Sequence, residues 1–121
     1  MPPKLTSRQQ AQLAWLETLP PKFARIKNTI EQMATLHADE ATVRGLVRTL
    51  DEMRANAQAY SMSGLAETSG VMATLSRRGG GLQMKVRGLR ELLQSLQANY
   101  EGAVRAASVP EAPGATGEGN A

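Results

Sequence analysis

One heptad pattern limits what this chain can fold into more than any other feature of the sequence. Its apolar positions alternate in steps of four and three: Leu82, Val86, Leu89, Leu93, Leu96, Tyr100 and Ala103. This spacing places them on one face of an α-helix, and such a face is stable only when other helices bury it. We therefore predict a helix from Leu82 to about Ala107. The run Gly79-Gly80-Gly81 just before it predicts a loop, because glycine weakens helices.

A second helical pattern begins near Asp39. The Asp39 carboxylate can cap the helix, and Glu40 lies in the first turn, where the helix dipole favours negative charge. The apolar positions that follow are Val43, Leu46, Leu50, Met53, Ala57 and Tyr60. After Tyr60 the pattern shifts to Met62, Leu65 and Ala66. We expect one long helix whose buried face rotates beyond Tyr60, so that the helix meets a different neighbour there.

Three shorter segments also have helical spacing. Proline is favoured at helix starts, so a helix is predicted after Pro20-Pro21. Its apolar positions are Phe23, Ile26, Ile30, Met33 and Leu36 or His37. Thr6 or Ser7 can cap an earlier, shorter helix. A further short helix is expected over 71–75, ahead of the glycine loop.

These segments predict an all-α fold. The chain has only four aromatic residues, a composition that disfavours β-sheets, which are usually rich in aromatic side chains. We predict an antiparallel four-helix bundle, with elements beginning near residues 22, 40, 70 and 82, and an extra short N-terminal helix. Residues 1–6 are expected to be a flexible lead-in and 7–107 the bundle domain. Residues 108–121, which hold two prolines and three glycines, are expected to be a disordered tail.

The composition excludes several kinds of chemistry. The chain has no cysteine and one histidine, which excludes thiolate and multi-histidine metal sites. Ala34 stands three residues before His37, so the Glu-x-x-His pair of di-iron bundles is missing. We expect no cofactor, no metal and no enzymatic activity. Met-Pro-Pro-Lys is followed by polar residues, and no apolar stretch approaches the ~20 residues of a membrane helix, which predicts a cytoplasmic protein that does not bind membranes.

Residues 59–70, Ala-Tyr-Ser-Met-Ser-Gly-Leu-Ala-Glu-Thr-Ser-Gly, carry the motif that points to a function. The segment resembles the core of histidine-phosphotransfer domains. In that family one helix carries Ala, the phosphorylated His, any residue, Leu, Lys or a small residue, Gly, any residue, Ala or Ser, three more residues and Gly. The positions that match are Ala59, Met62, Gly64, Ala66 and Gly70. Tyr60 stands in the place of the histidine, and Ser63 replaces the usual lysine. The family's four-helix bundle also agrees with the predicted order of elements.

The resemblance implies binding without phosphotransfer. Imidazole is nucleophilic near neutral pH, whereas a phenol has a pKa near ~10 and forms an ester that does not exchange readily with an aspartate. The implied function is a non-catalytic adaptor that binds a receiver domain or another protein of bacterial two-component or motility signalling. The implied protein-binding residues are Tyr60, Ser63, Gly64 and Glu67, with Arg77 and Arg78 nearby.

Each of the singled-out residues also has a structural interpretation. Tyr60 continues an apolar face and can be an aromatic residue of the core or of the edge of the bundle. Gly64 can serve close helix packing. His37 lies near a helix end, without the residues that follow a phosphoacceptor histidine, and is interpreted as a structural or surface residue.

The basic residues leave further alternatives open. The net charge is +3, and five cations fall between Arg77 and Arg90 with no acid among them: Arg77, Arg78, Lys85, Arg87 and Arg90. This cluster can be a solvated surface, a contact for an acidic protein or a phosphate-binding patch for nucleic acid.

The other alternative is a helical scaffold or homodimer that uses the apolar face from Leu82 to Ala103.

Overall fold

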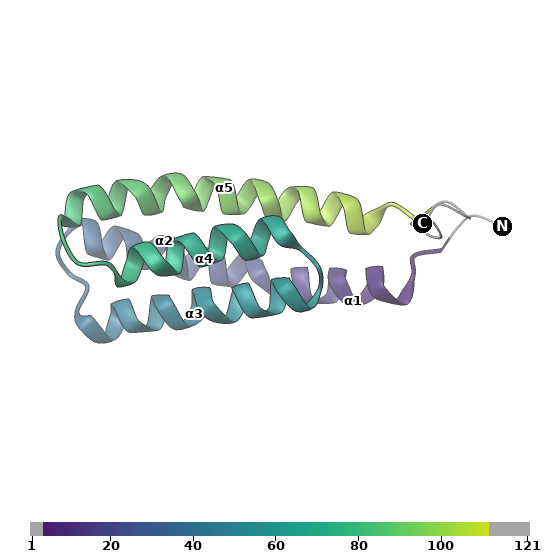
Figure 1. Cartoon of the computed structure of the whole chain (residues 1–121), viewed down its shortest axis with the longest axis horizontal. Helices are drawn as coiled ribbons and strands as arrows, with labels where there is room; N and C mark the ends of the chain where they lie inside the picture. Colours follow the sequence, from purple (N-terminus) through teal and green to yellow (C-terminus); the bar gives the residue numbers. More distant parts are fainter. Residues whose placement is uncertain (1–3, 112–121) are drawn as a thin grey trace.

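The computed structural model describes residues 4–111, which form five α-helices and no strand. The helices are α1 (Ser7–Leu16), α2 (Leu19–Ala34), α3 (Glu40–Ala59), α4 (Ser63–Arg77) and α5 (Leu82–Ser108). Helices α2, α3, α4 and α5 run side by side with short connections, and α1 leads into α2 end to end (Figure 1). The all-α bundle predicted from the apolar spacing is confirmed. None of the five helices has the length and apolar character needed to cross a membrane.

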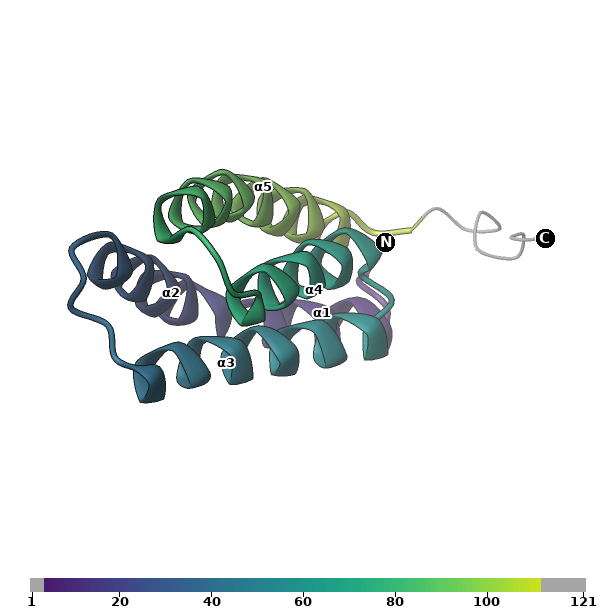
Figure 2. The same ribbon diagram turned by 60° about the vertical axis from the view of Figure 1, so that its left-hand side comes forward.

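The four longer helices form the bundle. α4 lies between α3 and α5, and α2 packs on α5 and, over a smaller contact, on α3 (Figure 2). α1 precedes α2 and packs on α5. The α3–α4 turn lies at one end of the bundle, whereas the α2–α3 and α4–α5 connections meet at the other end (Figure 1).

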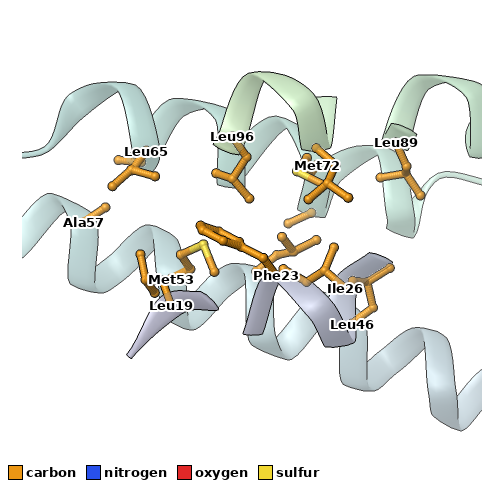
Figure 3. Close-up of a cluster of buried hydrophobic side chains, with 14 of the residues drawn as sticks. Leu19, Phe23, Ile26, Leu46, Met53, Ala57, Leu65, Met72, Leu89 and Leu96 are labelled. Atoms are coloured by element: carbon orange, nitrogen blue, oxygen red, sulfur yellow. The ribbon is translucent and has the colours of Figure 1, made fainter. Parts of the chain in front are cut away.

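The core is built mainly from aliphatic and methionine side chains that all four long helices supply, with Phe23 of α2 and Trp15 of α1 also buried. Leu19 and Ile26 of α2 meet Met53 of α3, Met72 of α4 and Leu96 of α5 (Figure 3). The predicted apolar face of α5 is confirmed, because its central residues are buried: Val86, Leu89, Leu93 and Leu96. This face lies inside the bundle, so a dimer would have to use another surface.

Two predicted helix starts are confirmed by their capping hydrogen bonds. The Thr6 hydroxyl accepts from the Gln9 backbone N–H at 3.0 Å, and the Gln9 side chain accepts from the Thr6 N–H, also at 3.0 Å. The Asp39 carboxylate accepts from the Thr42 backbone N–H at 2.8 Å. Helix α2 begins at Leu19, with Pro20 in its first turn, and not after the two prolines. It ends at Ala34, so Leu36 and His37 lie beyond it and are exposed, and they do not extend its apolar face as predicted.

The prediction that one long helix continues through Tyr60 is wrong. Helix α3 ends at Ala59, and α4 begins at Ser63. Between them Ser61 has a positive φ of 61°. The Met62 N–H donates to the Ala57 carbonyl at 2.8 Å, and the Ser61 N–H donates to the Gln58 carbonyl at 3.1 Å, a hydrogen-bond pattern that ends helices. The change in apolar spacing after Tyr60 therefore marks the start of a new helix.

The position of this turn also shows that the helix predicted to begin near residue 70 begins earlier. The expected short helix over 71–75 is the second half of α4, which starts at Ser63 and not near residue 70. The apolar residues that had suggested a rotated face, Leu65 and Ala66, lie in the first half of α4 and are buried.

Part of the predicted tail is ordered against α1. Ser108 is the last residue of α5. The Gln9 side-chain amide donates to the Val109 carbonyl at 2.6 Å, and the Arg8 guanidinium pairs with the Glu111 carboxylate at 3.0 Å. Residues 112–121 of the predicted tail and residues 1–3 of the predicted lead-in lie outside the described part of the chain.

Candidate functional site

An open groove of about 890 Å³ follows the line where α3 and α4 meet. Ala66, Gly70, Val71 and Leu75 of α4 are among its lining residues. The Val71 side chain is 49% exposed, although valine in a helix of this bundle would ordinarily face the core. The groove therefore presents apolar surface that the fold itself does not cover.

Charged side chains frame the same groove. Arg54 lines it from α3, Glu67 lines it from α4, and Arg78 lines it from just beyond the end of α4. A Cβ atom on Gly70 would lie 3.1 Å from Arg54 Cδ and 3.2 Å from Arg54 Nε. The lack of a side chain at Gly70 thus lets the Arg54 side chain approach α4.

Three of the six predicted protein-binding residues line this groove: Ser63, Glu67 and Arg78. Ser63 and Glu67 lie one helical turn apart on α4, and both are exposed. Arg78 directly follows the end of α4 and is also exposed. These three residues form one continuous surface with Val71.

Tyr60 is half-buried beside this groove and does not line it. Its ring stacks on Trp15 of α1, with the ring centroids 5.4 Å apart and an angle of 21° between the planes. Its carbonyl accepts a hydrogen bond of 2.9 Å from the Gln12 side chain. The structure places Tyr60 at the α3–α4 turn as an aromatic contact to α1, which agrees with the structural interpretation of this residue.

Gly64 faces α5 and not the groove between α3 and α4. A Cβ atom there would lie 3.0 Å from the Asn99 side-chain amide. That amide also lies 2.7 Å from the Thr68 hydroxyl. Gly64 therefore permits close packing of α4 on α5. The motif over 59–70 accordingly spans the end of α3, a turn and the first half of α4, and not the single helix that the family motif occupies.

The sixth predicted residue, Arg77, points away from Ser63 and Glu67. Its guanidinium forms an ion pair with Asp51 of α3. Both residues line a different groove, of about 750 Å³, together with Val43, Val47 and other residues of α3. Arg77 and Arg78 thus belong to two separate surfaces although they are neighbours in the sequence.

A second cation of the basic cluster is also paired. Arg90 of α5 donates to both Glu31 carboxylate oxygens, from Nε at 3.0 Å and from a terminal nitrogen at 2.7 Å. The hydrogen bond from Arg90 lowers the pKa of the Glu31 carboxyl below its ordinary value, and the same contact raises the pKa of Arg90. Among the described residues, Arg78, Lys85 and Arg87 form no ion pair. The cluster is therefore less available to phosphates than its sequence suggests.

His37 lies on the surface, in the α2–α3 connection. The residue is exposed, and its Nδ1 lies 3.0 Å from the Thr35 hydroxyl. Over residues 4–111 no three carboxylate or imidazole side chains come together in a way that could hold a metal ion.

No protein-family model matches the chain, and no curated protein and no solved structure is significantly similar to it.

The sequence did not identify two residues of the groove. No local sequence pattern marks Arg54, because its approach to Gly70 joins two different helices. The spacing of Val71, Met72 and Leu75 predicts a helix but does not show that Val71 is exposed. A usable signal was present, since Ala66, Gly70 and Thr74 follow one another at intervals of four residues and keep one face of α4 free of bulk.

Proposed function

We propose that this protein is a non-catalytic adaptor that binds another signalling protein through the groove between α3 and α4. The first candidate partner is a response-regulator receiver domain, in bacterial two-component or motility signalling. This choice rests on the resemblance of the sequence of residues 59–70 to histidine-phosphotransfer domains, although the segment here includes a turn between two helices, and on the all-α bundle.

The observation that carries the proposal is the exposed Val71 between charged neighbours. An apolar side chain in the middle of a groove, with Glu67 and Arg78 on the same lining, is typical of a protein-binding surface. Arg54 and Arg78 supply positive charge that suits the acidic surface around the phosphorylated aspartate of a receiver domain. This arrangement needs no reactive group from the adaptor.

The position of Tyr60 supports binding in place of phosphotransfer. Its phenol is a poor exchange partner for an aspartyl phosphate at neutral pH. Its ring is also held against Trp15, outside the groove lining. A partner that docks in the groove would therefore meet Val71 and Glu67 and not a nucleophile.

The test is titration of the purified full chain with purified receiver domains, with and without beryllofluoride as a mimic of the aspartyl phosphate. Binding to at least one receiver is expected, with amide chemical-shift changes along α4. Val71→Asp should weaken it by about tenfold or more, because it places a charge in the apolar centre of the contact. Val109→Asp, at an exposed valine away from the groove, is the matched control.

A second readout separates binding from phosphotransfer. The full chain is incubated with receiver domains that carry a radioactive phosphoryl group, and we expect no stable label on it. Label on His37 would contradict the non-catalytic proposal. Binding that Val71→Asp and Val109→Asp change equally would contradict the assignment of the groove.

A further inference from the structure

One exposed line of side chains runs along α4 where this helix lines the groove between α3 and α4. Its residues follow one another at intervals of three or four positions and are all exposed: Ser63, Glu67, Val71, Thr74 and the C-cap residue Arg78. Residues at these intervals share one face of a helix, along which another helix can pack. We name this line of five residues the α4 stripe. In Figure 1, α2 lies behind α4, and no described helix lies in front of it.

The α4 stripe holds one acid and one base that have no partner within the described chain. Glu67 and Arg78 are both exposed, and neither forms an ion pair among residues 4–111. Arg77, next to Arg78 in the sequence, is by contrast paired with Asp51 of α3. Glu67 and Arg78 are therefore both free to pair with opposite charges of a partner.

The order of the residues in the α4 stripe is complementary to itself. Glu67 and Arg78 are equally far along the chain from the point midway between Val71 and Thr74. When a second α4 lies antiparallel on the first, with a twofold axis at this point, Glu67 of each copy faces Arg78 of the other. Val71 of each copy then faces the methyl group of Thr74 in the other. A twofold dimer uses the same patch on both subunits, so it requires a self-complementary order of this kind.

Apolar side chains lie between the two charges. Val71 is 49% exposed and stands at the centre of the α4 stripe. Gly70 and the partly buried Leu75 line the groove beside it, and the same twofold axis places Gly70 of one copy opposite Leu75 of the other. The absence of a side chain at Gly70 leaves room for that leucine. An apolar centre between charged ends is the usual arrangement of a protein interface.

The remaining charge of the groove lining limits the strength of this contact. Arg54 lies against Gly70 from α3 and forms no ion pair among the residues that the structure describes. The antiparallel pairing leaves the Arg54 of each copy without an acid, so the two copies bring net positive charge together. The contact also extends along a single helix of about 22 Å. Both features predict a weak and reversible dimer.

We propose that the α4 stripe binds a second copy of this chain in an antiparallel, twofold arrangement. The inference goes beyond the proposed function, because self-association needs no receiver domain. It uses the same groove, so the second copy and a receiver domain exclude each other. The dimer is measured with this chain alone, and its failure is therefore distinct from a failure of receiver binding.

The test is analytical ultracentrifugation of the full chain over a wide range of concentrations, where we expect a reversible equilibrium between monomer and dimer. Glu67→Arg and Arg78→Glu should each weaken the dimer by about tenfold or more, because each places like charges opposite one another. An equimolar mixture of these two variants should dimerise as strongly as the parent chain, since every charge again faces its opposite. Recovery in the mixture also shows that neither variant is misfolded.

Two control variants make the same changes of charge away from the groove. Glu101→Arg on α5 and Arg25→Glu on α2 replace exposed residues and should leave the dimer unchanged. A chain that stays monomeric at every concentration would overturn the proposal. So would a dimer that Glu67→Arg and Glu101→Arg weaken equally. A mixture of Glu67→Arg and Arg78→Glu chains that dimerises no better than either variant alone would also overturn the antiparallel arrangement.

Discussion

The ring of Tyr60 stacks on the indole of Trp15, with 5.4 Å between the ring centroids. This contact joins α1 to the turn between α3 and α4, two parts of the chain that are far apart in the sequence. The Gln12 side chain strengthens the same junction by donating to the Tyr60 carbonyl at 2.9 Å. Tyr60 thus has a structural role at this junction.

Removal of this ring should destabilise the protein, whereas removal of its hydroxyl should not. Tyr60→Ala deletes the stacked contact and is expected to lower the free energy of unfolding by about 2 kcal/mol, because the ring is only half-buried. Tyr60→Phe keeps the stack and should change that free energy by less than about 0.5 kcal/mol. Urea denaturation followed by Trp15 fluorescence measures both variants. Equal destabilisation by the two substitutions would show that the hydroxyl, and not the stack, is important.

Replacement of Ser61 by glycine should stabilise the protein. Ser61 has a φ of 61°, and glycine adopts this region without the steric strain of a Cβ atom. Ser61→Gly is therefore expected to raise the free energy of unfolding by about 1 kcal/mol. Ser63→Gly is the matched control. It lies in the first turn of α4 with helical geometry and should lower the same free energy by about 0.5 kcal/mol.

Two glycines of α5 should respond differently to alanine. Alanine favours helix over glycine by about 1 kcal/mol. At Gly102 a Cβ atom would meet nothing within 4 Å, so Gly102→Ala should gain this amount. At Gly88 a Cβ atom would lie 2.8 Å from Leu75 Cδ2, so Leu75 must move. Gly88→Ala should therefore be less stable than Gly102→Ala by at least about 1 kcal/mol, as measured by thermal and urea unfolding. Similar gains at both sites would show that α4 and α5 are not packed closely at Leu75.

The sequence predicted the features that depend on local patterns. The apolar face of α5 and the caps at Thr6 and Asp39 follow from spacing and from nearby hydrogen bonds. The turn after Tyr60 was missed because Ser61 occupies the left-handed position where glycine usually signals a helix end. The turn after α2 gives no glycine signal either, because Leu36 occupies its left-handed position.

The candidate site was harder to predict than the fold. The resemblance of residues 59–70 to a known motif implied that Ser63 and Glu67 share a surface, and both line the groove between α3 and α4. Gly64 packs against Asn99 of α5, and Gly70 of α4 packs against Arg54 of α3. Both contacts join different helices, so no local sequence pattern predicts them. The sequence motif over residues 59–70 could not show that these residues form the end of α3, the turn after it and the first half of α4.

The Glu31–Arg90 ion pair should make stability depend on pH in the acid range. The pKa of Glu31 is lowered from its ordinary value of 4.5, chiefly by the hydrogen bond from Arg90, while desolvation acts in the opposite direction. A carboxyl with a lowered pKa binds protons less readily in the folded state than in the unfolded state. Its stabilising contribution is therefore fully present above the ordinary value of 4.5 and is lost as the pH falls through the lowered value.

Glu31→Gln should lose less stability than the parent protein on acidification below pH about 4.5, in urea unfolding at a series of pH values. Glu101→Gln, at an exposed acid of α5 with no ion pair among the described residues, should follow the parent profile. If both variants change the profile equally, the dependence comes from total charge and not from the Arg90 contact.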